Sequence, residues 1–325
     1  MTGDLQNIVD NTLVPHSAFV EASARIDQCM RYAIDSPEPI CLAIIGESRT
    51  GKSRVIEEYF SKHPSYRTEV GLIVPILSIK TPSKPTVKGI VEYMLYQMGD
   101  PRFDSGTENA KTIRLKRLMK YAGTRLLCLD EFQHFYDKGL RSVMHHIADW
   151  LKILVDDSRV GLIVSGIPSC MAVLEQNEQL IGRFSAPIVM PRFDWAKSGH
   201  REEFMGILGA FQNSIGVHFD IPRLDQDEMA FRCYCATGGL IGYLGRFLKQ
   251  AVINACDSNK RVITLSDLGV AHKMAIWNSG ADPSALRPFG RQFQGAYSEE
   301  LVARALEIGR PIAPVSQARN IRSTK

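Results

Sequence analysis

The chain has 325 residues, 45% of them hydrophobic and 23% charged, which is enough to build one large domain or two smaller ones. The 39 Lys and Arg exceed the 35 Asp and Glu, and this net charge of +4 permits an anionic partner without predicting one. No apolar run is long enough to predict a membrane span, the first residues do not resemble a secretory signal, and the seven cysteines are scattered, so we expect a cytoplasmic protein with reduced thiols and no membrane contact.

The first part of the chain alternates apolar runs with helical patterns. Residues 1–39 predict an N-terminal segment and a helix over 17–34, and apolar runs at 40–45, 71–79, 125–130, 160–166 and 186–191 predict strands. Pro75 lies inside the second run, which indicates an edge strand or a bulge. Strands that alternate with helices indicate an α/β fold with a central parallel sheet, here over residues 40–195.

The pattern changes after about residue 195. Strand-like runs stop, and helical periodicity continues to about residue 279, which predicts a smaller all-helical lid domain over 196–279. Residues 280–325 are rich in Pro, Gly and polar residues and predict a flexible C-terminal tail.

The stretch GESRTGKS, residues 46–53, matches the phosphate-binding pattern G-x-x-x-x-G-K-[ST] and lies between a strand and a helix. Its glycines allow successive backbone N–H groups to point at phosphate oxygens, and the helix start adds a positive dipole. We expect the lysine to reach the β- and γ-phosphates of ATP and the final serine to ligate Mg²⁺. The predicted nucleotide site consists of Gly46, Glu47, Ser48, Arg49, Thr50, Gly51, Lys52 and Ser53.

An acidic pair ends the third predicted strand, RLLCLDEF. Asp130 is placed to hold Mg²⁺, and Glu131 is suited to act as the general base for an attacking water. Two acids could also merely end a strand, but beside a complete phosphate loop the catalytic interpretation is favoured. Ser165 ends the fourth strand, where it could contact the γ-phosphate or the water, or equally begin a turn.

Taken together, these motifs resemble AAA+ ATPases and, more narrowly, the TniB/TnsC family of transposon AAA+ regulators. The resemblance rests on GESRTGKS, LLCLDEF, EQLIGRF and ATGGLIGYLGRFLKQA in this order, and it covers roughly residues 10–275. It implies ATP-dependent rings or filaments on double-stranded DNA that connect a TniQ-like target-selection protein to a transposase. It also implies that Arg183 completes a neighbouring subunit's site and that Arg246 closes over the nucleotide. Each arginine could instead be an ordinary surface residue.

The resemblance further implies that the loop after the second strand faces DNA, with Lys84 at the matching lysine. Lys80 and Lys88 flank it, and Arg102 could reach the same surface. Such contacts would go to the DNA backbone and carry little sequence information. A solvated lysine loop is the alternative. The basic residues of 108–121 surround much of their predicted helix, so we expect them to be solvated.

The sequence therefore predicts an ATPase that assembles on target DNA and is reset by hydrolysis. Two alternatives stay open. One is another DNA-associated AAA+ role, such as a helicase or replicase loader or a motor. The other is a small P-loop kinase, against which the long helical region after residue 195 argues.

Overall fold

The computed structural model describes residues 5–33, 38–137, 141–276 and 286–310. The chain forms two compact units, Ser17–Pro191 and the combination of Met1–His16 with Arg192–Lys325. This division differs from the one expected from sequence at the N-terminus. The helix expected within 1–39 packs on the sheet of the first unit, whereas the residues before it join the helical unit, because their apolar side chains, Val9 among them, pack into its core.

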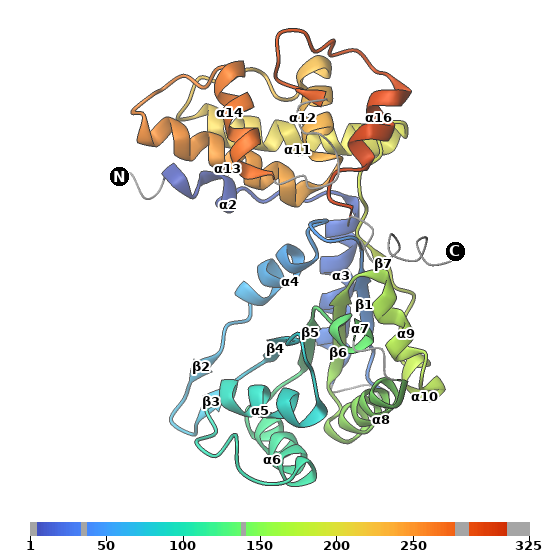
Figure 1. Cartoon of the computed structure of the whole chain (residues 1–325). Coiled ribbons are helices and arrows are strands. Elements are labelled where there is room, and N and C mark those ends of the chain that lie inside the picture. Colours follow the sequence, from blue (N-terminus) through green and yellow to red (C-terminus); the bar gives the residue numbers. More distant parts are fainter. Residues whose placement is uncertain (1–4, 34–37, 138–140, 277–285, 311–325) are drawn as a thin grey trace, which may run out of the picture. The chain divides into compact units, whose positions relative to one another are not determined.

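The first unit is built on a parallel sheet with the strand order β4-β5-β6-β1-β7 (Figure 1). Its strands are β1 (Leu42–Ile45), β4 (Ile76–Lys80), β5 (Leu126–Asp130), β6 (Gly161–Gly166) and β7 (Ile188–Val189). A separate antiparallel pair consists of β2 (Tyr66–Arg67) and β3 (Leu72–Ile73). The parallel α/β sheet predicted from sequence is confirmed, and the run with Pro75 is divided between β3 and the edge strand β4.

Helices cover both faces of this sheet. The helices are α3 (Ser17–Tyr32), α4 (Lys52–Ser61), α5 (Val87–Gln97), α6 (Glu108–Tyr121), α7 (His134–Asp137), α8 (Arg141–Ser158), the 3₁₀ turn η1 (Pro168–Cys170), α9 (Met171–Leu174) and α10 (Glu178–Ile181). Leu42 and Ile44 of β1 face one core, which also contains side chains of α3 and α4. Ala43 and Ile45 face a second core on the other side of the sheet, formed with the remaining helices of this unit, because successive side chains of a strand point to opposite faces.

Helix α6 departs from the expected solvated character. The side chain of Lys111 is 0% exposed and forms an ion pair with Glu92 of α5, while its Nζ donates to the Asp104 carbonyl at 2.6 Å. Arg114 binds Asp100 and the Arg102 carbonyl. The prediction of solvated charge was wrong at Lys111, because the loop between α5 and α6 folds back over the helix and supplies polar partners.

The second unit is helical, as predicted. Its helices are α2 (Ile8–Asn11), α11 (Ser198–Gly216), α12 (Asp227–Thr237), α13 (Ile241–Asp257), α14 (Leu265–Ala275) and α16 (Glu299–Leu306). Trp195, Phe231 and Tyr234 form the aromatic centre of its core. Arg192 enters this unit with its Nε donating to the Gly238 carbonyl at 2.7 Å.

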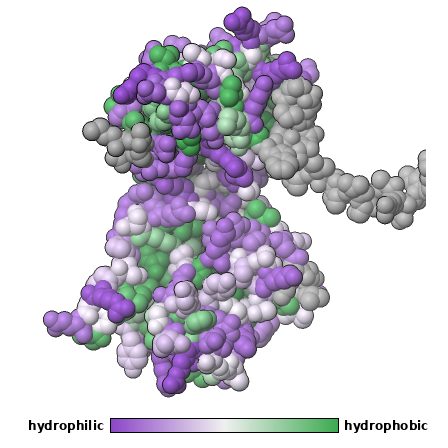
Figure 2. Space-filling model, turned by 60° about the vertical axis from the view of Figure 1, so that its left-hand side comes forward, coloured by the Kyte–Doolittle hydropathy of each residue, from purple (hydrophilic) through white to green (hydrophobic). Residues whose placement is uncertain are grey.

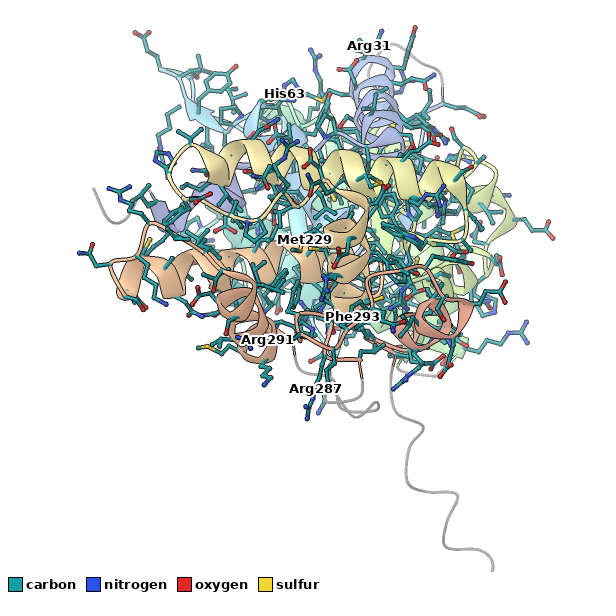
Figure 3. The ribbon with its side chains drawn as sticks, turned by 90° about the horizontal axis from the view of Figure 1, so that it is seen from above. Arg31, His63, Met229, Arg287, Arg291 and Phe293 are labelled. Carbon is teal, nitrogen blue, oxygen red and sulfur yellow. The ribbon has the colours of Figure 1, made fainter. Side chains whose placement is uncertain are left out.

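Part of the expected tail is packed onto the helical unit. Arg232 of α12 donates to the Pro288 carbonyl at 2.6 Å and to the Phe293 carbonyl at 2.9 Å, and Val302 of α16 is buried. Arg287 and Arg291 of the same segment are exposed, and Figure 3 shows Arg287 at the edge of the molecule. Residues 286–310 are therefore folded, whereas the remainder of the expected tail, 280–285 and 311–325, lies outside the described residues.

Hydrophilic residues dominate the visible surface of each unit, with small hydrophobic patches between them (Figure 2). Among the residues described, no helix has the length and apolarity needed to cross a membrane.

Candidate functional site

The segment 46–51 leaves the C-terminal end of β1 and curls into the first turn of α4. Gly51 takes a left-handed backbone conformation with φ of 96°, which a glycine adopts without strain. Gly46 has no room for a side chain, because a Cβ there would lie 2.5 Å from the Met190 carbonyl oxygen. The Gly46 N–H donates to the Gly166 carbonyl at 3.2 Å, which ties the loop to the end of β6. The segment therefore has the tight curl that a phosphate-binding loop needs.

Lys52 begins α4 and bends back over this loop. Its side-chain nitrogen donates to the Gly46 carbonyl at 2.9 Å and to the Glu47 carbonyl at 2.7 Å, and the residue is 9% exposed. Burial lowers the pKa of Lys52, while the negative charges of Glu131 and Asp130 act to raise it. A buried ammonium group held over curled backbone is suited to bind an anion such as a phosphate.

Ser53 and Asp130 meet across the site. The Ser53 hydroxyl donates to Asp130 Oδ2 at 2.9 Å, although the two residues come from α4 and β5. The other oxygen of Asp130 accepts the Glu131 N–H at 2.9 Å, which fixes the carboxylate. Oxygen atoms of this kind are the ligands that Mg²⁺ prefers, so the pair fits a magnesium ion.

Glu131 follows with its backbone in the left-handed region, at φ of 54°. Its side chain is 35% exposed; Oε1 lies 4.0 Å from Lys80 Nζ, and Oε2 accepts a hydrogen bond from the Gln133 amide. Ser165 of β6 is 0% exposed, its carbonyl accepts the Phe132 N–H at 2.9 Å, and its hydroxyl has no hydrogen-bond partner among the described residues. The structure therefore brings Asp130 of β5, the following Glu131 and Ser165 of β6 together at neighbouring strand ends.

The two predicted arginines lie elsewhere. The Arg183 carbonyl accepts the Cys41 N–H at 3.0 Å, just before β1, so Arg183 is at the opposite end of this strand from the phosphate loop. Its guanidinium donates to the Gln179 carbonyl at 2.8 Å and forms a 2.6 Å ion pair with Asp156 of α8. Arg246 is exposed on α13 and belongs to the helical unit.

The predicted DNA-contacting residues are available at the surface. Lys80 ends β4 with a side chain that is 73% exposed, and Lys84 and Lys88 are exposed in the following loop and helix. The Arg102 side chain is exposed, and its backbone is held by Asp100 and Arg114. Exposure leaves these side chains free to meet a polyanion, but Lys80 also lies beside Glu131, which the sequence did not indicate.

Gln133 was missed by the sequence analysis. It is 7% exposed and contacts both Glu131 and the segment that follows β6. The available signal was a single amide between Phe132 and Phe135 just after the acidic pair, since a polar side chain within an apolar stretch needs a hydrogen-bond partner.

A family model described as "Bacterial TniB protein" matches residues 5–195. The chain belongs to the TniB family. This match confirms the family resemblance stated from the sequence motifs. A search of curated proteins finds no match.

Solved structures of AAA+ proteins share the fold of this TniB protein. Cdc6p from Pyrobaculum aerophilum is 12% identical with a TM-score of 0.61, and the match covers 84% of this chain and 72% of that one. ORC2 of Aeropyrum pernix, in ADPNP-ADP complexes, is 13% identical with a TM-score of 0.60 and coverages of 85% and 72%. ORC1 of Aeropyrum pernix, in complex with DNA, is 13% identical with a TM-score of 0.55 and coverages of 83% and 69%. The AAA+ fold predicted from sequence is thereby confirmed.

Proposed function

We propose that this TniB protein is an ATPase that oligomerises on target duplex DNA, links a TniQ-like target-selection protein to a transposase, and is reset by hydrolysis. The observation that carries the ATPase part is the pairing of Ser53 with Asp130 directly beside Glu131, at the edge of the sheet where Lys52 covers the curled loop. The family supports the transposition part. The ORC2 and ORC1 structures, titled as nucleotide and DNA complexes, support ATP and DNA as ligands.

In this proposal each residue has a distinct task. Lys52 exchanges its bonds to loop carbonyls for bonds to the phosphates, and the backbone N–H groups from Glu47 to Gly51 surround them. Mg²⁺, held by Ser53 and Asp130, would neutralise charge on the phosphates. Glu131 accepts the proton of the attacking water, and Ser165 offers its buried hydroxyl to the γ-phosphate or to that water.

Assembly follows from the two arginines. Arg183 lies too far along the sheet to serve its own loop, so we propose that it serves the site of a neighbouring subunit in a ring or filament. Arg246, from the helical unit, would contact the nucleotide in the closed state. The nucleotide then stabilises the assembled state, and hydrolysis returns the subunits to the free state.

The DNA contacts would come from exposed basic residues of the α/β unit. The DNA phosphates would be bound by Lys80, Lys84, Lys88 and Arg102. The affinity for DNA would therefore depend on the salt concentration much more than on the base sequence.

Two substitutions test the ATPase. Lys52→Ala removes the buried ammonium and should abolish ATP binding, measured with a fluorescent ATP analogue.

Glu131→Gln keeps the shape of the side chain but removes the base. It should still bind ATP, slow turnover by about 10²–10⁴-fold and lengthen the lifetime of the DNA-bound assemblies seen by electron microscopy. Wild-type turnover in Glu131→Gln, or a protein that stays monomeric with ATP and DNA, would contradict the proposal.

A second candidate is another DNA-associated AAA+ role, such as a helicase or replicase loader or a motor, because the Cdc6p and ORC structures share this fold. Recruitment of a transposase, rather than a helicase, to the ATP- and DNA-bound protein separates the two. A P-loop kinase would transfer phosphate to an added nucleotide or protein acceptor in the same assay.

A further inference from the structure

Gln133 bridges the ends of two strands of the sheet. Its side-chain Nε2 donates to Oε2 of Glu131, which follows β5, and its Oε1 accepts the backbone N–H of Ile167, which follows β6, at 3.3 Å. Only 7% of Gln133 is exposed, so these two hydrogen bonds form largely out of water.

The chemistry of the two partners fixes the orientation of this amide. A carboxylate accepts hydrogen bonds, and a backbone N–H donates one, so the NH₂ group must face Glu131 and the carbonyl must face Ile167. A neutral side chain that both donates and accepts at this length is needed here. Glutamate, lysine and methionine each lack one of these properties.

Gly166 makes room for the bridge. A Cβ at Gly166 would lie 2.6 Å from Gln133 Oε1, closer than such atoms approach in proteins. The same residue's carbonyl accepts the Gly46 N–H of the phosphate loop, and Ser165 precedes it. The bridge therefore joins Glu131 to the part of β6 that contacts the loop.

We propose that Gln133 is a positioning residue for the general base. It occupies Oε2 of Glu131 and leaves Oε1, on the side of Lys80, for the attacking water. The bridge also makes the orientation of Glu131 depend on the position of the Ser165–Ile167 segment. Without this hydrogen bond the Glu131 carboxylate could rotate and would spend less time within reach of the water. Turnover should therefore depend on the bond from Gln133. The inference rests on the proposed function, because it assigns Glu131 the role of base.

The main experiment replaces Gln133 with methionine, which has a similar length and no amide. Gln133→Met should lower kcat by roughly tenfold to a hundredfold, while the affinity for an ATP analogue with Mg²⁺ changes less than about twofold. Gln97→Met, at an exposed position on α5, is the matched control and should leave both quantities unchanged. Unchanged kcat in Gln133→Met would overturn the inference. It would also be overturned if the affinity for the ATP analogue fell as much as kcat and the melting temperature fell as well, because the substitution would then act on the whole fold.

The pH dependence of turnover separates a positioning role of Gln133 from a purely structural one, because a purely structural role would not change it. In Gln133→Glu the new carboxyl can donate to Glu131 only when it is protonated, and when ionised it repels Glu131. Turnover of Gln133→Glu, relative to the unaltered protein, should therefore fall as the pH rises. A constant ratio across pH would overturn the inference, even if Gln133→Met proves unstable. Absence of turnover in the unaltered protein with ATP, Mg²⁺ and DNA would instead overturn the proposed function, and this inference with it.

Discussion

At the scale of single residues, Arg183 is held by Asp156 and the Gln179 carbonyl within its own subunit. An arginine that serves a neighbour must exchange this ion pair for contacts to a phosphate. In the proposed assembly, this pair would hold the guanidinium until a neighbouring nucleotide competes for the two N–H donors that contact α8 and α10 in this structure.

Mixed assemblies test this role. Arg183→Ala protein keeps its own phosphate loop but lacks the arginine, and Lys52→Ala protein keeps the arginine but lacks ATP. Each should turn over slowly alone, and a mixture should regain activity, because a Lys52→Ala subunit can supply Arg183 to its neighbour. Phosphate release at several mixing ratios measures this. If the mixture stays as inactive as its components, Arg183 does not act between subunits.

The residues of the site differ in how far sequence could predict them. Lys52, Ser53, Asp130 and Glu131 belong to local motifs, in which spacing along the chain dictates chemistry. Gln133 depends on a partner, Ile167, that is distant in sequence and brought near by strand pairing. No local pattern encodes such a partner, so the bridge became visible only in the structure.

At the scale of elements, α6 illustrates the same limit. The helix predicted over 108–121 is present, but the expectation that its charges are solvated was wrong at Lys111, whose partners lie outside the helix. Strands β1 and β5 were predictable because each has four consecutive apolar residues that are buried on both faces of the sheet. Their order was not, since β6 separates β1 from β5 through crossovers that leave no trace in composition.

The buried charge of α6 yields a prediction of stability. Lys111→Met removes the ammonium that pairs with Glu92 and leaves that carboxylate and the Asp104 carbonyl without it, so the free energy of unfolding should fall by about 3 kcal/mol. Lys116→Met, on the same helix, breaks a more exposed pair with Asp157 and should cost less than about 1 kcal/mol. Denaturant unfolding of the two variants makes the comparison. If both variants lose the same free energy of unfolding, the buried ion pair of Lys111 stabilises the fold no more than the exposed pair of Lys116.

At the scale of the whole molecule, the proposed DNA surface predicts a salt dependence. If Lys84 binds a phosphate, Lys84→Ala should reduce the slope of log affinity against log salt by about 0.9 per subunit, with the same change on unrelated duplexes. Lys62→Ala, at an exposed lysine after α4 that pairs with Glu58, is the control and should leave the slope unchanged. Fluorescence anisotropy at several salt concentrations gives the slopes, and identical slopes for all three proteins would remove Lys84 from the interface.

The close packing of Gly46 against Met190 has a consequence for the sheet itself. Met190 follows β7, and its N–H donates to the carbonyl of Ile45, the last residue of β1, at 2.7 Å. A Cβ at position 46 would lie 2.5 Å from the Met190 carbonyl oxygen, so even the methyl group of an alanine would have to push the ends of β1 and β7 apart. The bare backbone of Gly46 therefore also keeps the edge strand β7 paired with β1.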